Sequence, residues 1–128
     1  GIVYGVAVSL GFATYENYDY VFRLALEWKE YGVTSEDVAI WRSYSAVPMH
    51  GLNGCLMGFY IGKYVFTGDK KFLTYSFTIP FLMHGIYNYF VQFGVLIVLI
   101  QLVFALKLHK ELSILQIVKK KEFEKKKI

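Results

Sequence analysis

Four long runs of apolar residues alternate with shorter polar segments along the chain. They cover residues 1 to about 22, about 44 to 66, 72 to about 92, and about 94 to 108. A helix rises about 1.5 Å per residue, so roughly 20 apolar residues cross the hydrocarbon of a bilayer. The first three runs are therefore long enough to predict membrane-spanning helices, whereas the fourth is short.

The last two runs admit two interpretations. One is a single kinked helix over residues 72–108 with bends at Pro80 and Gly94. The other is two separate helices that run in opposite directions. The lysines favour this second interpretation, because they cluster both before the third run and after the fourth. If both clusters lie on the cytoplasmic side, an even number of spans separates them, which requires a reversal near Gln92-Phe-Gly94. We therefore expect two spans after Lys71.

The polar segment from Arg23 to Ser43 then lies on the outer side of the membrane. Thr34-Ser-Glu-Asp37 is typical of a helix N-cap with acidic residues in the first turn. Trp28 and Trp41 suit the headgroup level. The segment therefore predicts an interfacial helix.

Composition supports the membrane class, since 55% of the residues are hydrophobic and 19% are aromatic. The mean hydropathy is +0.38. Residues 111–128 end in a lysine-rich run, which predicts a cytoplasmic tail beside anionic lipid rather than a nucleic-acid-binding segment. The predicted fold is an all-α polytopic membrane helix bundle of about four transmembrane helices plus an interfacial helix, with residues 1–110 as its core and 111–128 as the tail.

Polar residues inside the apolar runs are the candidates for function. Glu16 lies in the first run, His50 in the second, and His84 and Asn88 in the third. The predicted topology puts all four in the outer half of the membrane. Ionisable groups at that depth are costly and need partners. We therefore expect them to converge.

Helical faces favour this convergence. His50 continues a stripe of glycines spaced by four, and Glu16 follows small residues on its own helix. Such stripes let membrane helices pack closely, which is their commonest role. The members of the two faces are Gly54, Gly58 and Gly62, and Gly5, Ser9 and Phe12. Near the outer surface, Arg23 and Arg42 are expected to pair with carboxylates.

A carboxylate facing imidazoles either binds a divalent metal or holds a water and directs it at a carbonyl. Glu16, His50 and His84 supply at most the three protein ligands of a zinc site, and the Asn88 amide suits a developing oxyanion. This pattern is that of a peptidase. Two alternatives remain: haem held between His50 and His84 as axial ligands, and a helix-packing or immunity-type protein with an inert site.

These residues resemble the PrsW family of intramembrane proteases, relatives of CAAX-processing and bacteriocin-immunity membrane proteases. The family's Phe-x-x-x-Glu motif is similar to Phe12-Ala-Thr-Tyr-Glu16, and its His-x-x-x-Asn motif is similar to His84-Gly-Ile-Tyr-Asn88. The segment around His50 resembles the intervening helix. The resemblance implies that Glu16 activates water or ligates a metal, and that His84 and Asn88 ligate a metal or stabilise the oxyanion. It leaves open whether a metal such as zinc takes part.

The resemblance also implies a multi-pass protein of a bacterial or archaeal cell membrane that cleaves a membrane-protein substrate. The family's paired motif, Glu-Glu-x-x-Lys, has no counterpart in these residues. Because the chain begins without methionine, we expect that motif upstream; without it the protein would be an inactive relative.

Overall fold

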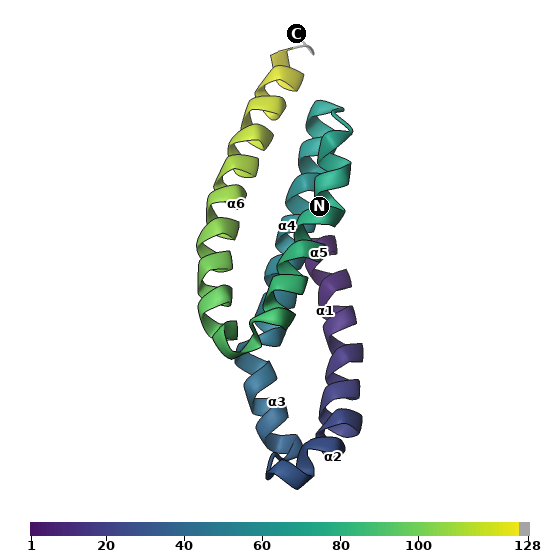
Figure 1. Cartoon of the computed structure of the whole chain (residues 1–128). Coiled ribbons are helices and arrows are strands. Elements are labelled where there is room, and N and C mark those ends of the chain that lie inside the picture. The colour runs from purple at the N-terminus through teal and green to yellow at the C-terminus, as the bar shows by residue number, and fades with distance from the viewer. Residues whose placement is uncertain (126–128) are drawn as a thin grey trace.

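Four long helices make up most of the chain in the computed structural model, which describes residues 1–125 (Figure 1). Long side chains and few internal helix breakers favour the helical state throughout. No strand occurs in that described range. The long helices are α1 (Ile2–Tyr18), α4 (Ala46–Thr67), α5 (Lys71–Tyr89) and α6 (Gly94–Lys125).

Short elements connect the first two long helices. A π-helical turn, η1 (Asp19–Leu24), follows α1 and leads into α2 (Ala25–Trp28) and the 3-10 turn η2 (Lys29–Tyr31). Gly32, with a φ of 77°, then reverses the chain into α3 (Ser35–Tyr44). The predicted N-cap is confirmed: the Thr34 hydroxyl accepts a hydrogen bond from the Asp37 amide, and the Asp37 carboxylate accepts one from the Thr34 amide.

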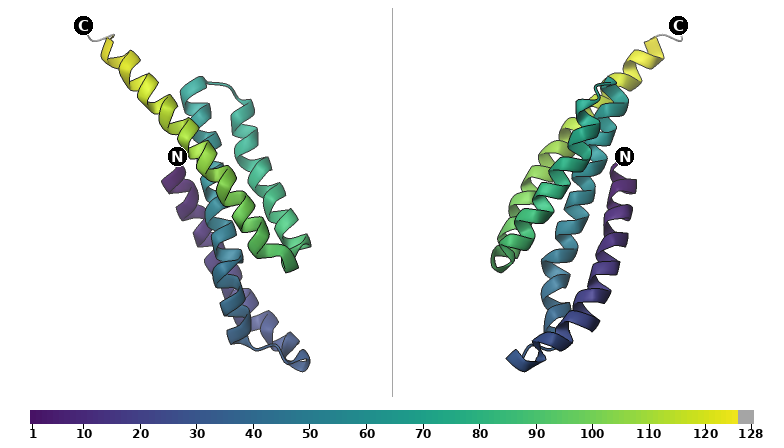
Figure 2. Two further views of the ribbon diagram at one scale, coloured as in Figure 1. Left: turned by 90° about the vertical axis from the view of Figure 1, so that its left-hand side faces the viewer. Right: turned by 45° about the vertical axis from the view of Figure 1, so that its right-hand side comes forward.

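Helix α4 is the centre of the bundle, because α1, α5 and α6 all pack against it. Helices α5 and α6 run in opposite directions and are joined by the 3-10 turn η3 (Val91–Phe93) (Figure 2). The predicted reversal near Gln92-Phe-Gly94 is therefore correct, and a single kinked helix is excluded. A small core of Ala46, Met49, Tyr87 and Val98 joins α4 to these two helices.

The fourth helix is longer than its apolar run predicted. Helix α6 has 32 residues, about 48 Å, and continues past residue 108 through most of the predicted tail to Lys125. The run ends where the side chains become polar, but Lys, Glu, Leu and Gln are good helix formers and no Gly or Pro follows Gly94. The predicted tail positions 126–128 lie outside the described residues.

By length and composition, one helix within residues 1–125 is long and apolar enough to cross a membrane: the stretch Val91–Lys125, whose most apolar window has a mean hydropathy of 2.3. Helix α1 has only 17 residues, and glycines and polar side chains interrupt α4 and α5. Large apolar side chains nevertheless cover the outward faces of all four long helices. Soluble monomers rarely expose such extensive apolar surface, so the chain is a membrane protein.

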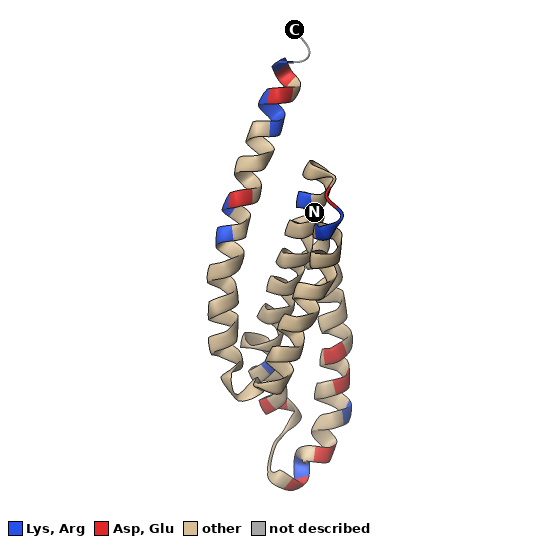
Figure 3. Cartoon of the chain, turned by 45° about the horizontal axis from the view of Figure 1, so that its top comes forward, with Lys and Arg blue, Asp and Glu red and all other residues tan. Residues whose placement is uncertain are grey.

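Charged residues lie mainly near the two ends of the bundle (Figure 3). Lysines gather at the α4–α5 turn and along the C-terminal half of α6, whereas acidic and basic residues mix around the α1–α3 connection. Lys63 of α4 donates a hydrogen bond to Glu111 of α6 at 2.6 Å. This contact holds α6 beside α4 at the lysine-rich end.

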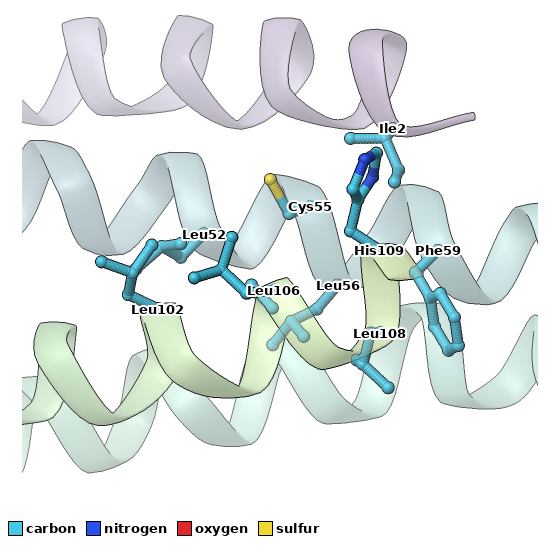
Figure 4. Close-up of a pocket in the computed structure, with 10 residues that line it drawn as sticks. Ile2, Leu52, Cys55, Leu56, Phe59, Leu102, Leu106, Leu108 and His109 are labelled. Carbon is cyan, nitrogen blue, oxygen red and sulfur yellow. The ribbon is translucent and has the colours of Figure 1, made fainter. Parts of the chain in front are cut away.

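A cavity of about 150 Å³ lies between α1, α4 and α6 (Figure 4). Its walls are apolar apart from Cys55 and His109, and none of the described residues that line it carries a carboxylate. Its lining residues are Ile2, Leu52, Cys55, Leu56, Phe59, Leu102, Ala105, Leu106, Leu108 and His109. The cluster of Glu16, His50 and His84 lies instead near the opposite end of α1.

Candidate active site

Helix α1 carries Glu16 in its last turn and packs against α4 through the small residues Gly5, Ser9 and Ala13, which are buried. The Ser9 hydroxyl donates a hydrogen bond to the backbone carbonyl of His50 at 2.6 Å. This bond fixes the register of the two helices. It places Glu16 opposite the N-terminal part of α4.

The separation of α1 and α4 depends on glycine. A Cβ atom added at Gly54 would lie 2.6 Å from the carbonyl oxygen of Gly5 and from Cα of Val6. Gly58 meets the backbone of Gly1 and Ile2 in the same way. Two small-residue faces therefore bring the helix backbones into direct contact, as the sequence predicted.

His50 and Glu16 meet across this contact. The His50 side chain is almost fully buried, and its Nε2 lies 3.2 Å from Oε2 of Glu16. A carboxylate removed from water requires partners of this kind. The Glu16–His50 pair joins the C-terminal end of α1 to the N-terminal part of α4.

His84 of α5 approaches the other oxygen of the same carboxylate. Its Nε2 lies 3.3 Å from Oε1 of Glu16, and the His50 and His84 ring centroids are 5.0 Å apart. The His84 Nε2 is buried, yet the alignment with Oε1 is too poor for a hydrogen bond and no other described residue supplies one. An orphaned imidazole nitrogen that faces a carboxylate and a second imidazole is suited to a metal ion or an ordered water.

Phe12 supports both imidazoles. Its ring centroid lies 5.7 Å from that of His50 and 6.2 Å from that of His84. Phe12 and Glu16 are separated by one helical turn and share a face of α1. The aromatic ring therefore restricts the orientations of the two histidines that contact Glu16.

Asn88 lies beside His84 but not beside Glu16. Its amide Nδ2 is 3.4 Å from Nδ1 of His84, and the residue is exposed. If the Asn88 amide is rotated by 180°, its Oδ1 accepts a hydrogen bond from a protonated Nδ1 of His84. The Nε2 of His84 then carries a lone pair. Asn88 can therefore select the tautomer of His84 through one hydrogen bond.

Arg42 completes the surroundings of Glu16. It donates from Nη2 to Oε2 of Glu16 at 3.2 Å and from Nε to Oδ1 of Asn17 at 2.7 Å. The guanidinium also lies 4.2 Å from the centroid of the Tyr20 ring. Arg42 is buried rather than at the surface, because α3 folds back against η1 and packs on α4.

The structure brings together Glu16, His50 and His84. Asn88 contacts His84 but not Glu16. Their predicted catalytic and ligand roles stay predictions. The sequence indicated that Arg42 pairs with a carboxylate, but not that the carboxylate is Glu16, and Asn17 was not recognised as a site residue. Its position next to Glu16 was the one available signal. The expected pairing of Arg23 is with Asp19, at 3.0 Å from Nη2 to Oδ2.

One ligand atom from each of Glu16, His50 and His84 can be chosen so that the three atoms lie within 4.8 Å of one another. One carboxylate oxygen and two imidazole nitrogens form a donor set that divalent transition metals favour. The orphaned Nε2 of His84 supports this fit. The two imidazoles face a shared carboxylate rather than opposite sides of a porphyrin, so the geometry does not support the haem alternative.

Comparisons with known proteins identify the family of the chain. Protease PrsW of Bacillus subtilis (strain 168) is 44% identical to the chain over 92 residues, which are 70% of this chain and 38% of that protein. Proteins of the same name from Oceanobacillus iheyensis and Geobacillus kaustophilus are 39% and 41% identical, over 72% and 70% of this chain. These alignments cover 39% and 36% of the two relatives.

The chain thus spans somewhat over a third of the length of these curated relatives. No solved structure matches it. A family model described as PrsW family intramembrane metalloprotease matches residues 1–108, a range that includes every candidate site residue. The chain belongs to the PrsW family of intramembrane metalloproteases.

Proposed function

We propose that this chain forms most of the hydrolytic centre of an intramembrane endopeptidase that cleaves a peptide bond of a membrane-protein substrate. The observation that carries the proposal is the convergence of Glu16, His50 and His84 from three helices in a chain of the PrsW family. Glu16 lies in the last turn of α1, which leads through η1 into α2, and His50 lies in the first two turns of α4, which follows α3.

The proposed topology has four spans, α1, α4, α5 and α6, in a cell membrane. Lysines at the α4–α5 turn and along α6 favour the cytoplasmic side for that end and for the C-terminal tail (Figure 3). Helices α2 and α3 then lie at the outer interface with Trp28 and Trp41. This arrangement puts Glu16 in the outer half of the bilayer, where a substrate helix leaves the hydrocarbon.

The chemistry assigned to these residues is activation of water. Glu16 accepts the proton of the attacking water and passes it to the leaving amine, with Oε1 as the reacting oxygen because Oε2 already contacts Arg42 and His50. In the alternative role of Glu16, a divalent metal such as zinc, held by Glu16, His50 and His84, would supply a Lewis acid that acidifies the water. Arg42 positions the carboxylate.

His84 and Asn88 have a second proposed role. Both lie on the same face of α5, one turn apart, and Asn88 extends toward the outer end of the helix. The Asn88 amide donates to the oxygen of the tetrahedral intermediate when it is not engaged by His84. The lipid bilayer surrounds this site and excludes bulk water from it.

The proposal is tested with the protein in proteoliposomes that contain single-span reporter substrates. Glu16→Gln is expected to lower kcat by at least about 100-fold, because it removes the acid–base group. His84→Ala is expected to abolish cleavage and to reduce bound metal, measured by elemental analysis. His109→Ala is the matched control, since His109 lies outside the site and both properties should be retained.

Circular dichroism and membrane extraction verify that each variant inserts and folds. Retained cleavage in both Glu16→Gln and His84→Ala would contradict the proposed function. A wild-type protein that binds metal but cleaves no reporter would favour an inert relative. A Soret band in the purified protein would favour the haem alternative instead.

A further inference from the structure

A cavity of about 290 Å³ opens beside the candidate active site, between the α1–α3 connection and the end of α5. Five elements contribute to its walls: η1, α2, α3, α5 and η3. Its lining residues are Tyr20, Trp28, Val38, Arg42, Tyr87, Asn88 and Val91. The cavity differs from the one in Figure 4, which lies between α1, α4 and α6.

Two wall residues connect this cavity directly to the site. Arg42 contacts Oε2 of Glu16, and Asn88 lies 3.4 Å from the ring of His84. A group that fills the cavity is therefore separated from the Glu16 carboxylate only by the Arg42 side chain, and from the His84 imidazole only by the Asn88 side chain. A peptide bound at the site would place a neighbouring side chain here.

The cavity is predominantly apolar and aromatic. Tyr20, Trp28 and Tyr87 supply aromatic surface, and Val38 and Val91 supply aliphatic surface. Arg42 contributes the only formal charge among the described lining residues, and its guanidinium is already engaged by Glu16, Asn17 and the Tyr20 ring. The walls therefore favour a neutral side chain over an acidic one.

Its position also matches one kind of occupant. The cavity lies beyond the last turn of α1 and against η3, at the end of the bundle where Trp28 and Tyr20 suit the membrane interface. A substrate helix that unwinds as it leaves the hydrocarbon presents extended residues at this level. The volume accommodates one large side chain but not a second helix.

We propose that this cavity is the specificity subsite of the enzyme and receives a bulky apolar side chain, aromatic or large aliphatic, next to the scissile peptide bond. The inference rests on the proposed function. Burial of that side chain holds the carbonyl carbon close to Glu16 and His84. Substrates with a small or acidic residue at this position lose that contact.

The test uses the protein in proteoliposomes and a set of single-span reporters. Mass spectrometry first identifies the cleaved bond, and residues within two positions of it are then varied among Phe, Leu, Ala and Asp. With the wild type, we expect kcat/KM to be at least about tenfold higher for Phe or Leu than for Ala at one position. Cleavage of the Asp reporter should be weaker still.

Two variants connect this preference to the cavity. Val91→Trp narrows it and should remove the advantage of Phe over Ala. Tyr89→Trp is the matched control, because Tyr89 is 78% exposed and does not line the cavity, so the preference should persist. Trp28→Ala enlarges the cavity and should weaken the preference for Phe, with the effect mainly on KM.

Each outcome is informative. Equal cleavage of all four reporters, a preference for Asp, or a Phe preference that survives Val91→Trp would overturn the subsite, while the hydrolytic function would stand. If the wild type cleaves no reporter, the proposed function itself fails. If Val91→Trp does not fold, Trp28→Ala provides the same comparison with a smaller side chain.

Discussion

The contact between α1 and α4 predicts that Gly54→Ala separates the two helices that carry Glu16 and His50. An added Cβ would lie 2.6 Å from the carbonyl oxygen of Gly5, whereas ordinary contacts begin at 3.4 Å. The clashing atoms belong to the backbone, so no side-chain rotation relieves them. Helix α1 therefore has to move outward by about 0.8 Å.

This displacement sets the expected magnitude. Overpacking costs about 1–3 kcal/mol, and the replacement of a mid-helix glycine by alanine returns about 0.5–1 kcal/mol. The hydrogen bond from Ser9 Oγ to the His50 carbonyl, now 2.6 Å, lengthens to the limit of bonding distance. We expect a net loss of about 1–2 kcal/mol in the free energy of unfolding, together with weaker metal binding.

The measurement is unfolding in mixed micelles, followed by circular dichroism as the fraction of denaturing detergent rises. Gly51→Ala is the matched control on the same helix, because its added Cβ meets only Leu10 Cδ2 at 3.9 Å. That variant should be neutral or more stable by about 0.5–1 kcal/mol. Equal stability of the Gly54→Ala and Gly51→Ala variants would refute the close backbone contact.

Three further predictions concern other contacts. Arg42→Leu leaves the Glu16 carboxylate with one partner fewer and should lower the free energy of unfolding by about 2–3 kcal/mol. Arg42→Lys keeps the positive charge and should lower the free energy of unfolding by less. Hydrogen bonds from Thr34 hold the pKa of Asp37 below its ordinary 3.8, so α3 should keep its hydrogen-exchange protection above about pH 4 and lose it only as the pH falls further. Thr34→Ala should weaken that protection by about 1 kcal/mol at neutral pH, and protection unchanged in this variant would contradict the cap. Chelator treatment should lower the Tm of the wild type but not of His84→Ala, since metal at 100 times its Kd stabilises by about 2.7 kcal/mol.

The convergence of the candidate site could be predicted from the sequence. Hydropathy indicates the depth of each polar residue in its helix, and the helical period indicates the face on which the residue lies. Glu16 and His50 each continue a small-residue stripe, and such stripes must face another helix. Two helices that meet through these stripes bring the polar residues at their ends together. The Thr34 cap was predicted because it depends only on residues that are neighbours in the sequence.

The full length of α6 and the role of Arg42 were not predicted. Hydropathy reports where an apolar run ends, not where a helix ends, so the predicted tail began at residue 111, although residues 111–125 have helical propensities. Arg42 reaches Glu16 only because η1, η2 and Gly32 bring α3 back beside η1, and such turns leave no periodic signal. Asn17 depends on the same fold-back.

Chain order gives Arg42 an early role in biosynthesis. Arg42 follows Glu16 by 26 residues, whereas His50 and His84 come later. Since a ribosome makes the chain from its N-terminus, the counter-charge for Glu16 emerges before either imidazole does. Arg42 of α3 can thus neutralise Glu16 of α1 while the chain is still being made, and the histidines of α4 and α5 then add to a carboxylate whose orientation is set.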